Sequence, residues 1–563
     1  MTGVLTADGL LRRLGLPAVA VLYALYVAYF VQLTSLPLQD YPNHVARAVV
    51  LGDLIFHDGA RFGEVFSFHI VAAPYLLTDL LLTVCLQLVG AKAGAGIFSA
   101  LVLLSLPGAL LFYMSANELA PRGRLLLALI GLYLTTETFF LLGFFAFRLA
   151  LALVIVSLAL ADLLRRAWSP ALYAAYLSAL VLGYLLHLTA LVFFAATLLV
   201  SGLTRLWFHR TTWRREIYLL VPVAALLMLH FGAVIGWSHT ASAHKYGYDW
   251  GDPGQKLRDF SSWFTRLGGA SAYVMLIALA ACMLWPVRRE LAAGALKRPA
   301  VVEQLLLAAT FLGIFLVLPS EYSDAAHVDV RAIPLIVVFL IFACLQMSAD
   351  SAGRAFESPP VLALALALAL ANLGYLAQHL GRSNAWLARY RQIVASIPAG
   401  AQVLPVDTQP GIWGATHAGS FVLLDRAALT PYLFSADRGD PMSYFRYRHR
   451  TYTPSESWYR VQKEWSAATE NSYEVQGRLY TWRFTHSAKS NEWRMADLAP
   501  VTWNLVACNY EYLLMMRPFD ANLIGVATRT VASNEAAALL AVDRQPCRPS
   551  TGHSEVRLPR EGQ

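Results

Sequence analysis

The chain of 563 residues is 57% hydrophobic and only 14% charged, and its formal net charge is +8. Soluble globular domains carry roughly 25% charged residues, so this composition excludes a soluble enzyme, a disordered chain and a fibrous repeat. The surplus of Lys and Arg lies at the ends of apolar segments, which favours contact with membrane lipid and predicts no nucleic-acid partner.

Apolar segments follow one another through the first two thirds of the chain, and most approach the ~20 residues that cross a bilayer as one helix. Arg12 and Arg13 precede the first segment, which we interpret as a retained signal anchor. Basic clusters at 165–166, 205–215 and 288–298 predict the cytoplasmic side of the membrane. The apolar segments are 15–36, 75–90, 94–115, 124–138, 143–163, 170–187, 188–203, 217–237, 269–286, 303–318, 331–348 and 360–378.

The second apolar segment, 75–90, does not fit a simple crossing. It is short and contains Asp79 and Gln87, and a crossing here would place Arg122 and Arg124 on the wrong side of the membrane. We therefore predict a juxtamembrane or re-entrant element that does not cross. About 11 crossings then remain, with the N-terminus in the cytoplasm and the C-terminal region outside.

These segments predict an all-α polytopic membrane protein with about 11 transmembrane helices, juxtamembrane helices and a C-terminal extracytoplasmic α/β domain. We expect a transmembrane domain over 1–379, with an external loop at 37–74, and a second domain over 380–563. The predicted location is the cytoplasmic (inner) membrane, as a multi-pass protein.

The loop after the first apolar segment contains the run Leu-Gln-Asp-Tyr-Pro-Asn-His-Val-Ala-Arg, which ends at Arg47. Pro42 suits the first turn of a helix, and apolar residues then recur at helical spacing, so we expect an amphipathic helix over 42–57. His44 and Arg47 share one face of this helix. Asp40, just ahead of it, is either an acid that stabilises the helix N-terminus or, at the bilayer edge, a general base.

Three ionisable residues lie at the next two external turns. Glu137 ends one apolar segment, and Arg148 lies just inside the following one. Charged side chains at this depth usually face a bundle interior or a functional cavity, so Arg148 is a candidate phosphate ligand and Glu137 a supporting residue. His187 lies between two apolar stretches, where it either supports the site or is a hydrogen-bonded structural histidine.

Asp329 and Arg331 stand where an apolar segment begins on the predicted external side. An Arg here runs against the positive-inside trend, and its guanidinium can hold a phosphate through two parallel hydrogen bonds. We therefore expect Arg331 to bind phosphate and Asp329 to support it. The alternative is a snorkelling Arg331 that pairs with Asp329 or Glu321.

The sequence contains no established metal or nucleotide motif. His239, His244, Asp249 and Asp252 crowd one external loop, where they either bind a divalent ion or belong to an ordinary solvated loop. We predict no firm cofactor and no metal ligand.

The region 380–563 alternates short strand-like and helical stretches, which predicts a small α/β domain. Its middle part, 431–493, is rich in Tyr, Trp and Arg, and these rings either stack on a saccharide or pack in a core. Cys508 and Cys547 are the plausible disulfide pair if the region faces an oxidising compartment. The predicted strands are 402–406, 420–424, 501–508 and 523–531, and the predicted helices are 386–396 and 533–542.

This arrangement resembles the GT-C superfamily of integral-membrane glycosyltransferases. The resemblance rests on the run DYPNHVAR around Asp40, a non-crossing juxtamembrane segment, a multi-span core over about 15–380 and an external C-terminal domain. It implies a polyprenyl-phosphate-linked sugar donor and Asp40 as the catalytic base. By position it also suggests Glu137 as a second acid and Arg331 as a ligand of the donor phosphate. The paired acids of the family's first loop are absent, since Tyr41 follows Asp40.

The sequence therefore predicts a membrane glycosyltransferase that moves a sugar from a polyprenyl-phosphate donor to a hydroxyl of a glycan or lipid acceptor, with inversion at the anomeric carbon. Two alternatives stay open: a transporter or flippase of a lipid-linked glycan, and a non-catalytic membrane scaffold. The predicted site comprises Asp40 as the base, Arg331 and Arg148 on the phosphate, and His44, Arg47, Glu137, His187 and Asp329 in support.

Overall fold

The computed structural model divides the chain into two compact units. The first comprises Met1–Ala385 and Phe434–Arg448, and the second comprises Trp386–Leu433 and His449–Gln563. The residues that the structure describes are 7–33, 35–117, 123–209, 213–238, 248–250, 253–265, 269–292, 294–322, 325–326, 328–347, 358–406, 412, 414–415, 417–430, 445–447, 506–507, 510–517 and 524–545.

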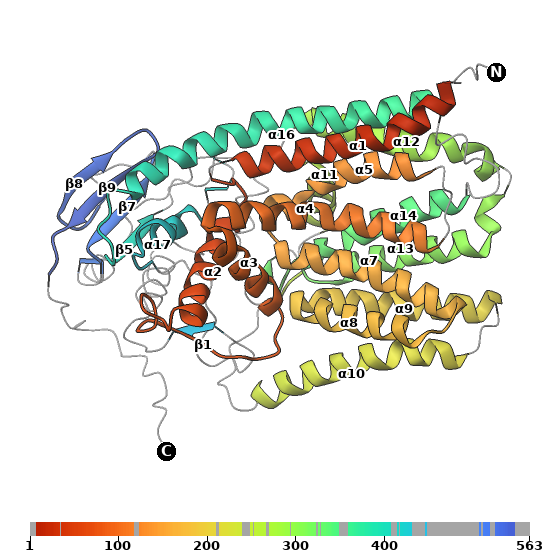
Figure 1. Cartoon of the computed structure of the whole chain (residues 1–563), viewed down its shortest axis with the longest axis horizontal. Helices are drawn as coiled ribbons and strands as arrows, with labels where there is room; N and C mark the ends of the chain where they lie inside the picture. The colour runs from red at the N-terminus through yellow and green to blue at the C-terminus, as the bar shows by residue number, and fades with distance from the viewer. Residues whose placement is uncertain are drawn as a thin grey trace. The chain divides into compact units, whose positions relative to one another are not determined.

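The first unit is a bundle of apolar helices, as the hydropathy pattern predicts. Figure 1 shows α4, α7, α9, α13 and α14 lying roughly parallel, with α2 crosswise to them. The helices are α1 (Ala7–Gln32), α2 (Tyr41–Phe56), α3 (Leu76–Val89), α4 (Ala91–Ala116), α5 (Arg124–Thr135), α6 (Thr138–Leu142), α7 (Phe145–Arg166), α8 (Pro170–Leu186), α9 (Leu188–His209), α10 (Trp213–Ser238), α11 (Pro253–Thr265), α12 (Gly269–Ala292), α13 (Pro299–Val317), α14 (Ile333–Met347) and α16 (Pro359–Val394).

The described part of the chain holds 8 helices that are long and apolar enough to cross a membrane, besides shorter apolar helices. The protein is therefore a multi-pass integral membrane protein, and the predicted fold class is confirmed. The short helix α3 has 14 residues, about 21 Å at 1.5 Å per residue. That is less than the ~30 Å hydrocarbon core, as a non-crossing element requires.

The turn between α3 and α4 depends on two glycines. Gly90 ends α3 with a φ of 84°, in the left-handed region that favours glycine. Gly94 lies against the last turn of α3, where an added Cβ would be 2.3 Å from the carbonyl oxygen of Cys85. The two helices can therefore pack backbone to backbone, and they form an antiparallel pair beside α2.

Short strands join distant loops of the first unit. β1 (Phe66–Phe68) pairs antiparallel with β6 (Phe445–Tyr447), and the rings of Phe66 and Phe445 stack with centroids 5.2 Å apart. β2 (Tyr248–Asp249), β3 (Glu321–Tyr322) and β4 (Ala325–Ala326) form a second antiparallel sheet. The second sheet connects the loop before α11 to the loop that leads into the one-turn 3-10 helix η3 (Val330–Ala332).

The second unit contains a four-stranded sheet in the order β5-β7-β9-β8. β5 (Val403–Val406) pairs parallel with β7 (Tyr512–Met516), whereas β9 (Ala537–Val542) pairs antiparallel with β7 and with β8 (Thr528–Ser533). Alternate residues of β7 enter the two cores on opposite faces of the sheet, as the period of a strand requires.

Two local predictions in this unit are wrong. The stretch 533–542 was expected to be a helix, but its second half is β9, because Ala-Ala-Leu-Leu-Ala-Val is buried on both faces of the sheet and its apolar run has no helical period. The stretch 420–424 was expected to be a strand, but Phe421–Arg426 form the short helix α17. Cys508 and Cys547 lie outside the described residues, so the predicted disulfide is untested.

Candidate functional site

Asp40 lies at the start of α2, at one end of the helix bundle. Its backbone N–H donates to the carbonyl oxygen of Leu142 at 3.0 Å, and its own carbonyl accepts from the N–H of His44 at 3.1 Å. The residue is 9% exposed. Gly143 packs against this backbone with a φ of 80°, and an added Cβ would lie 3.1 Å from the nitrogen atoms of Asp40 and Tyr41.

A buried ion pair supports the segment that holds Asp40. Glu137 caps α6 by accepting hydrogen bonds from the N–H groups of Phe139 at 2.7 Å and Phe140 at 3.2 Å. The same carboxylate pairs with Arg148, whose guanidinium also donates to the carbonyl of Leu134 at 3.1 Å and is 0% exposed. This pair therefore fixes α6, and the end of α6 fixes Asp40.

Arg331 lies in η3, at the start of α14, and is 8% exposed. Its guanidinium carbon lies 5.7 Å from the ring centroid of Phe144 and 5.9 Å from that of Phe147, and both rings offer cation–π contact. Asp40 lies at the same turn, since Gly143, the neighbour of Phe144, packs against the backbone of Asp40. The structure thus brings together a carboxylate and a guanidinium that are far apart in the sequence.

His187 and Tyr75 complete the surroundings of Arg331. His187 Nε2 lies 2.9 Å from Tyr75 Oη and 3.4 Å from Arg331 Nη1. Burial, and then the positive charge of Arg331, lower the pKa of His187 well below its ordinary value, so the imidazole is neutral at pH 7. We call Asp40, Tyr75, Phe144, Phe147, His187 and Arg331 the Arg331 cluster.

Asp329 holds the turn that carries Arg331. Its carboxylate accepts from the N–H of Val330 at 2.8 Å, from Ser320 Oγ at 3.1 Å and from Lys256 Nζ at 3.0 Å. Lys256 also donates to the carbonyl oxygens of Phe315 at 3.0 Å and Leu318 at 2.6 Å. Burial raises the pKa of Asp329, although Lys256 opposes the rise.

The two remaining predicted residues lie on α2. Arg47 Nε donates to Asp79 Oδ2 at 2.6 Å, which ties α2 to α3. His44 packs its ring 6.0 Å from the ring of Phe145. Both side chains therefore help to place α2, while the Arg331 cluster lies around the start of that helix.

Sequence reasoning missed Tyr75 and Lys256. Tyr75 stands at the first position of an apolar stretch, where an aromatic residue reads as a membrane-interface anchor. Lys256 lies in a polar loop helix whose charges resemble a solvated face. Neither position has a sequence pattern that marks its partner, because the partners come from other parts of the chain.

The predicted residues do not form a metal site within the described part of the chain. No group of three or more His, Cys, Asp or Glu side chains is arranged there to hold an ion. His239, His244 and Asp252 lie outside the described residues.

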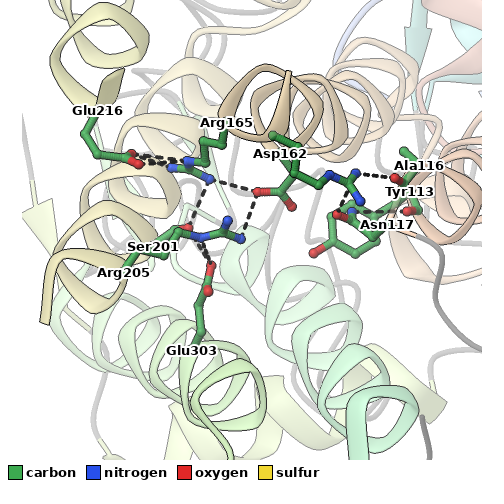
Figure 2. Close-up of polar contacts among 10 residues, drawn as sticks. Tyr113, Ala116, Asn117, Asp162, Arg165, Ser201, Arg205, Glu216 and Glu303 are labelled. Carbon is green, nitrogen blue, oxygen red and sulfur yellow. Dashed lines mark hydrogen bonds and ion pairs between the residues drawn. The ribbon is translucent and has the colours of Figure 1, made fainter. Parts of the chain in front are cut away.

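A second charged region lies at the other end of α7, and Figure 2 shows it. Arg165 is bonded to Glu216 by Nε at 3.0 Å and Nη2 at 2.7 Å, and to Asp162 by Nη1 at 2.9 Å. Arg205 contacts Asp162 at 2.9 Å and Glu303 at 3.1 Å. We call Asp162, Arg165, Ser201, Arg205, Glu216 and Glu303 the Arg165 network.

The Arg165 network joins four helices, α7, α9, α10 and α13. Ser201 Oγ donates to Glu303 Oε1 at 2.5 Å and accepts from Arg165 Nη1 at 3.3 Å. The sequence interpretation treated Arg165 and Arg205 as charges that mark the cytoplasmic side. The structure shows that both have carboxylate partners inside the bundle (Figure 2), so they also hold helices together.

Comparison with known proteins identifies the fold. No family model and no curated protein matches the sequence. The crystal structure of ArnT from Cupriavidus metallidurans in the apo state matches with 14% identity and a TM-score of 0.50, over 94% of this chain and 98% of that chain. This chain has the fold of that ArnT structure.

Two further structures match with lower TM-scores. ArnT from Cupriavidus metallidurans bound to undecaprenyl phosphate is 13% identical, with a TM-score of 0.48 over 95% of this chain and 98% of that chain. The arabinofuranosyltransferase AftD from Mycobacteria is 15% identical, with a TM-score of 0.48 over 94% of this chain and 42% of that chain.

Proposed function

We propose that this protein is a membrane glycosyltransferase that transfers a sugar from a polyprenyl-phosphate-linked donor to a hydroxyl of a glycan or lipid acceptor, on the extracytoplasmic face. The observation that carries the proposal is the placement of Asp40 and Arg331 at one turn of the chain, where Gly143 packs against the backbone of Asp40 and Phe144 contacts the guanidinium of Arg331. The fold supports it, since ArnT has been solved bound to undecaprenyl phosphate.

The two groups suit the two halves of a single displacement. Asp40 accepts the proton of the acceptor hydroxyl as its oxygen attacks the anomeric carbon. The bond from that carbon to the phosphate oxygen breaks, and the electron pair stays on the departing polyprenyl phosphate. Arg331 stabilises the negative charge that develops there. Attack opposite the leaving group inverts the anomeric carbon.

The supporting residues take different roles from those that the sequence suggested. Arg148 was expected to bind the donor phosphate, but its complete burial against Glu137 favours a positioning role. Asp329 and Lys256 place Arg331, and His187 lies against its guanidinium. We therefore assign phosphate binding to Arg331.

The proposal is tested with purified protein in lipid nanodiscs and a panel of undecaprenyl-phosphate sugars. Asp40→Asn and Asp40→Ala should lower sugar transfer by about 10²- to 10⁴-fold, while binding of undecaprenyl phosphate persists. Arg331→Met should weaken binding of undecaprenyl phosphate by about tenfold or more.

A matched control is Asp58→Asn, which changes an exposed acid in the loop that follows α2. It should transfer sugar at the wild-type rate. Wild-type transfer by both Asp40 variants would exclude Asp40 as the base, and wild-type affinity of Arg331→Met would remove Arg331 from the phosphate.

A further inference from the structure

The backbone of Tyr75 is strained, its side chain is accessible to a ligand, and the proposed mechanism gives it no role. It begins α3 with a φ of 72°, in the left-handed region that an aromatic residue rarely adopts. Its N–H donates to the carbonyl of Leu186 at 3.1 Å, which sets its ring edge-on to His187, with centroids 4.9 Å apart. Strained residues of this kind gather at functional sites.

The hydrogen bonds of His187 fix the direction of the bond to Tyr75. The backbone N–H of Thr189 donates to His187 Nδ1 at 3.2 Å, so Nδ1 is an acceptor. The neutral imidazole carries one proton, and this proton must be on Nε2. Because Nε2 lies 2.9 Å from Tyr75 Oη, His187 donates to the phenol oxygen.

Arg331 leaves this arrangement in place. Its Nη1 lies 3.4 Å from His187 Nε2, which is long for a hydrogen bond, whereas Tyr75 Oη lies 2.9 Å from that nitrogen. The phenol oxygen thus accepts from His187, so the proton of Tyr75 is directed to another group. The incoming N–H donor also polarises the O–H and strengthens it as a donor. Tyr75 is 39% exposed, so a ligand can reach it.

We propose that Tyr75 is a further catalytic residue, which donates a hydrogen bond to the phosphate of the sugar donor. This inference rests on the proposed function. As the carbon–oxygen bond to the phosphate breaks, the phosphate gains one negative charge, and the hydrogen bond from Tyr75 strengthens. The proton stays on Tyr75, since Asp40 takes the proton of the acceptor.

The test is Tyr75→Phe, which keeps the ring and removes only the hydroxyl. In nanodiscs, its affinity for undecaprenyl phosphate should fall about tenfold, the value expected for one hydrogen bond to a charged group. The kcat of sugar transfer should fall by about 10- to 100-fold with a smaller change in KM, because the bond is strongest in the transition state.

A matched control is Tyr184→Phe. The Tyr184 hydroxyl also lies beside a histidine, 3.2 Å from His230 Nδ1, and it donates to the carbonyl of Ala72 at 3.1 Å. This variant loses a comparable Tyr–His hydrogen bond that is not part of the Arg331 cluster. It should bind undecaprenyl phosphate as the wild type does.

The role of His187 gives an independent check that does not alter Tyr75. His187→Gln retains a side-chain N–H that can donate to the Tyr75 oxygen, so it should keep most of the affinity. His187→Leu has no such donor and should lose affinity about as Tyr75→Phe does. If wild type and His187→Leu bound undecaprenyl phosphate with equal affinity, the proposed hydrogen bond from His187 to Tyr75 would be excluded.

Different results would contradict the role of Tyr75 and the proposed function. Wild-type affinity and kcat in a folded Tyr75→Phe, together with losses in Arg331→Met and Asp40→Asn, would overturn the role of Tyr75 alone. Wild-type behaviour of Arg331→Met and Asp40→Asn would instead overturn the proposed function.

Discussion

The two charged regions at the ends of α7 differ in the groups that surround their arginines. In the Arg165 network, Arg165 and Arg205 each lie within 3.2 Å of two carboxylates, and those acids come from α7, α10 and α13. In the Arg331 cluster, which also contains Asp40, the guanidinium lies within 5.9 Å of two Phe ring centroids and 3.4 Å from a neutral imidazole. Direct ion pairs connect helices in the first region, whereas in the second region aromatic side chains contact a guanidinium that we propose binds a ligand.

The most direct test of this comparison is to remove one cation from each region. Arg165→Met leaves Glu216 and Asp162 buried without their main partner, so we expect a loss of about 3–5 kcal/mol in unfolding free energy. Arg331→Met replaces a buried cation beside Phe144 and Phe147 with an apolar side chain. We expect it to lose less stability than Arg165→Met, about 1–2 kcal/mol, because the Met side chain packs against the same rings. Thermal unfolding in detergent measures both.

Arg205→Met removes the other cation of the Arg165 network, so it should also lower the unfolding free energy of the protein. Equal losses for Arg165→Met and Arg331→Met would show that the two regions are built alike.

Lys256 should have the next largest effect. Lys256→Met leaves the Asp329 carboxylate without its cation and two carbonyl groups without a donor, which we expect to cost about 2–3 kcal/mol at pH 7. Burial already raises the pKa of Asp329, and loss of Lys256 raises it further. The folded variant then binds a proton that the unfolded chain releases, so its stability falls as pH rises.

The measurement is unfolding of Lys256→Met from pH 4 to 8, with Lys256→Met/Asp329→Asn as the control. The double variant should recover part of the stability at pH 7 and lose the pH dependence. An equally steep pH dependence in the double variant would contradict this account.

Gly143→Ala should have a smaller effect on stability but a direct effect on the site. Its φ of 80° is strained for alanine, and a Cβ 3.1 Å from the nitrogen of Asp40 would push that backbone away by a few tenths of an ångström. We expect a loss of about 1–2 kcal/mol and reduced sugar transfer, since Asp40 must move. Gly183→Ala is the control, because an added Cβ there meets no atom within 4 Å. Wild-type transfer by Gly143→Ala would show that Asp40 tolerates the shift.

The last prediction concerns stability at low pH. The folded pKa of His187 is lowered by burial and by Arg331, so below pH ~6.5 the unfolded chain gains a proton that the folded state does not. Wild-type stability should fall toward low pH by up to ~1.4 kcal/mol per pH unit from this group. His187→Gln should flatten the profile, measured by unfolding at pH 5 to 7.5. An unchanged slope would mean that other groups carry it.

The sequence was sufficient for features that depend on local composition. Apolar length predicted the spans, and Pro42 marked the start of α2 behind Asp40. The sequence did not predict contacts between residues that are far apart along the chain. Arg165 shows this, because a window of sequence counts its charge but does not contain Glu216. Tyr75 shows it too, since its role depends on Thr189, His187 and Arg331. In β9, burial on both faces overrode the helix preference of Ala and Leu.

The length of α7 has a consequence for the surrounding lipid. Arg165 lies 17 positions after Arg148, about 26 Å along the helix, and both buried charges have ion-pair partners inside the bundle. A hydrocarbon core is ~30 Å thick. When a helix does not match this thickness, the bilayer thins or thickens locally or the helix tilts. The spacing of these ion pairs therefore suits a hydrocarbon core of about this thickness, and we expect lipids with longer acyl chains to thin locally around α7 or to strain it.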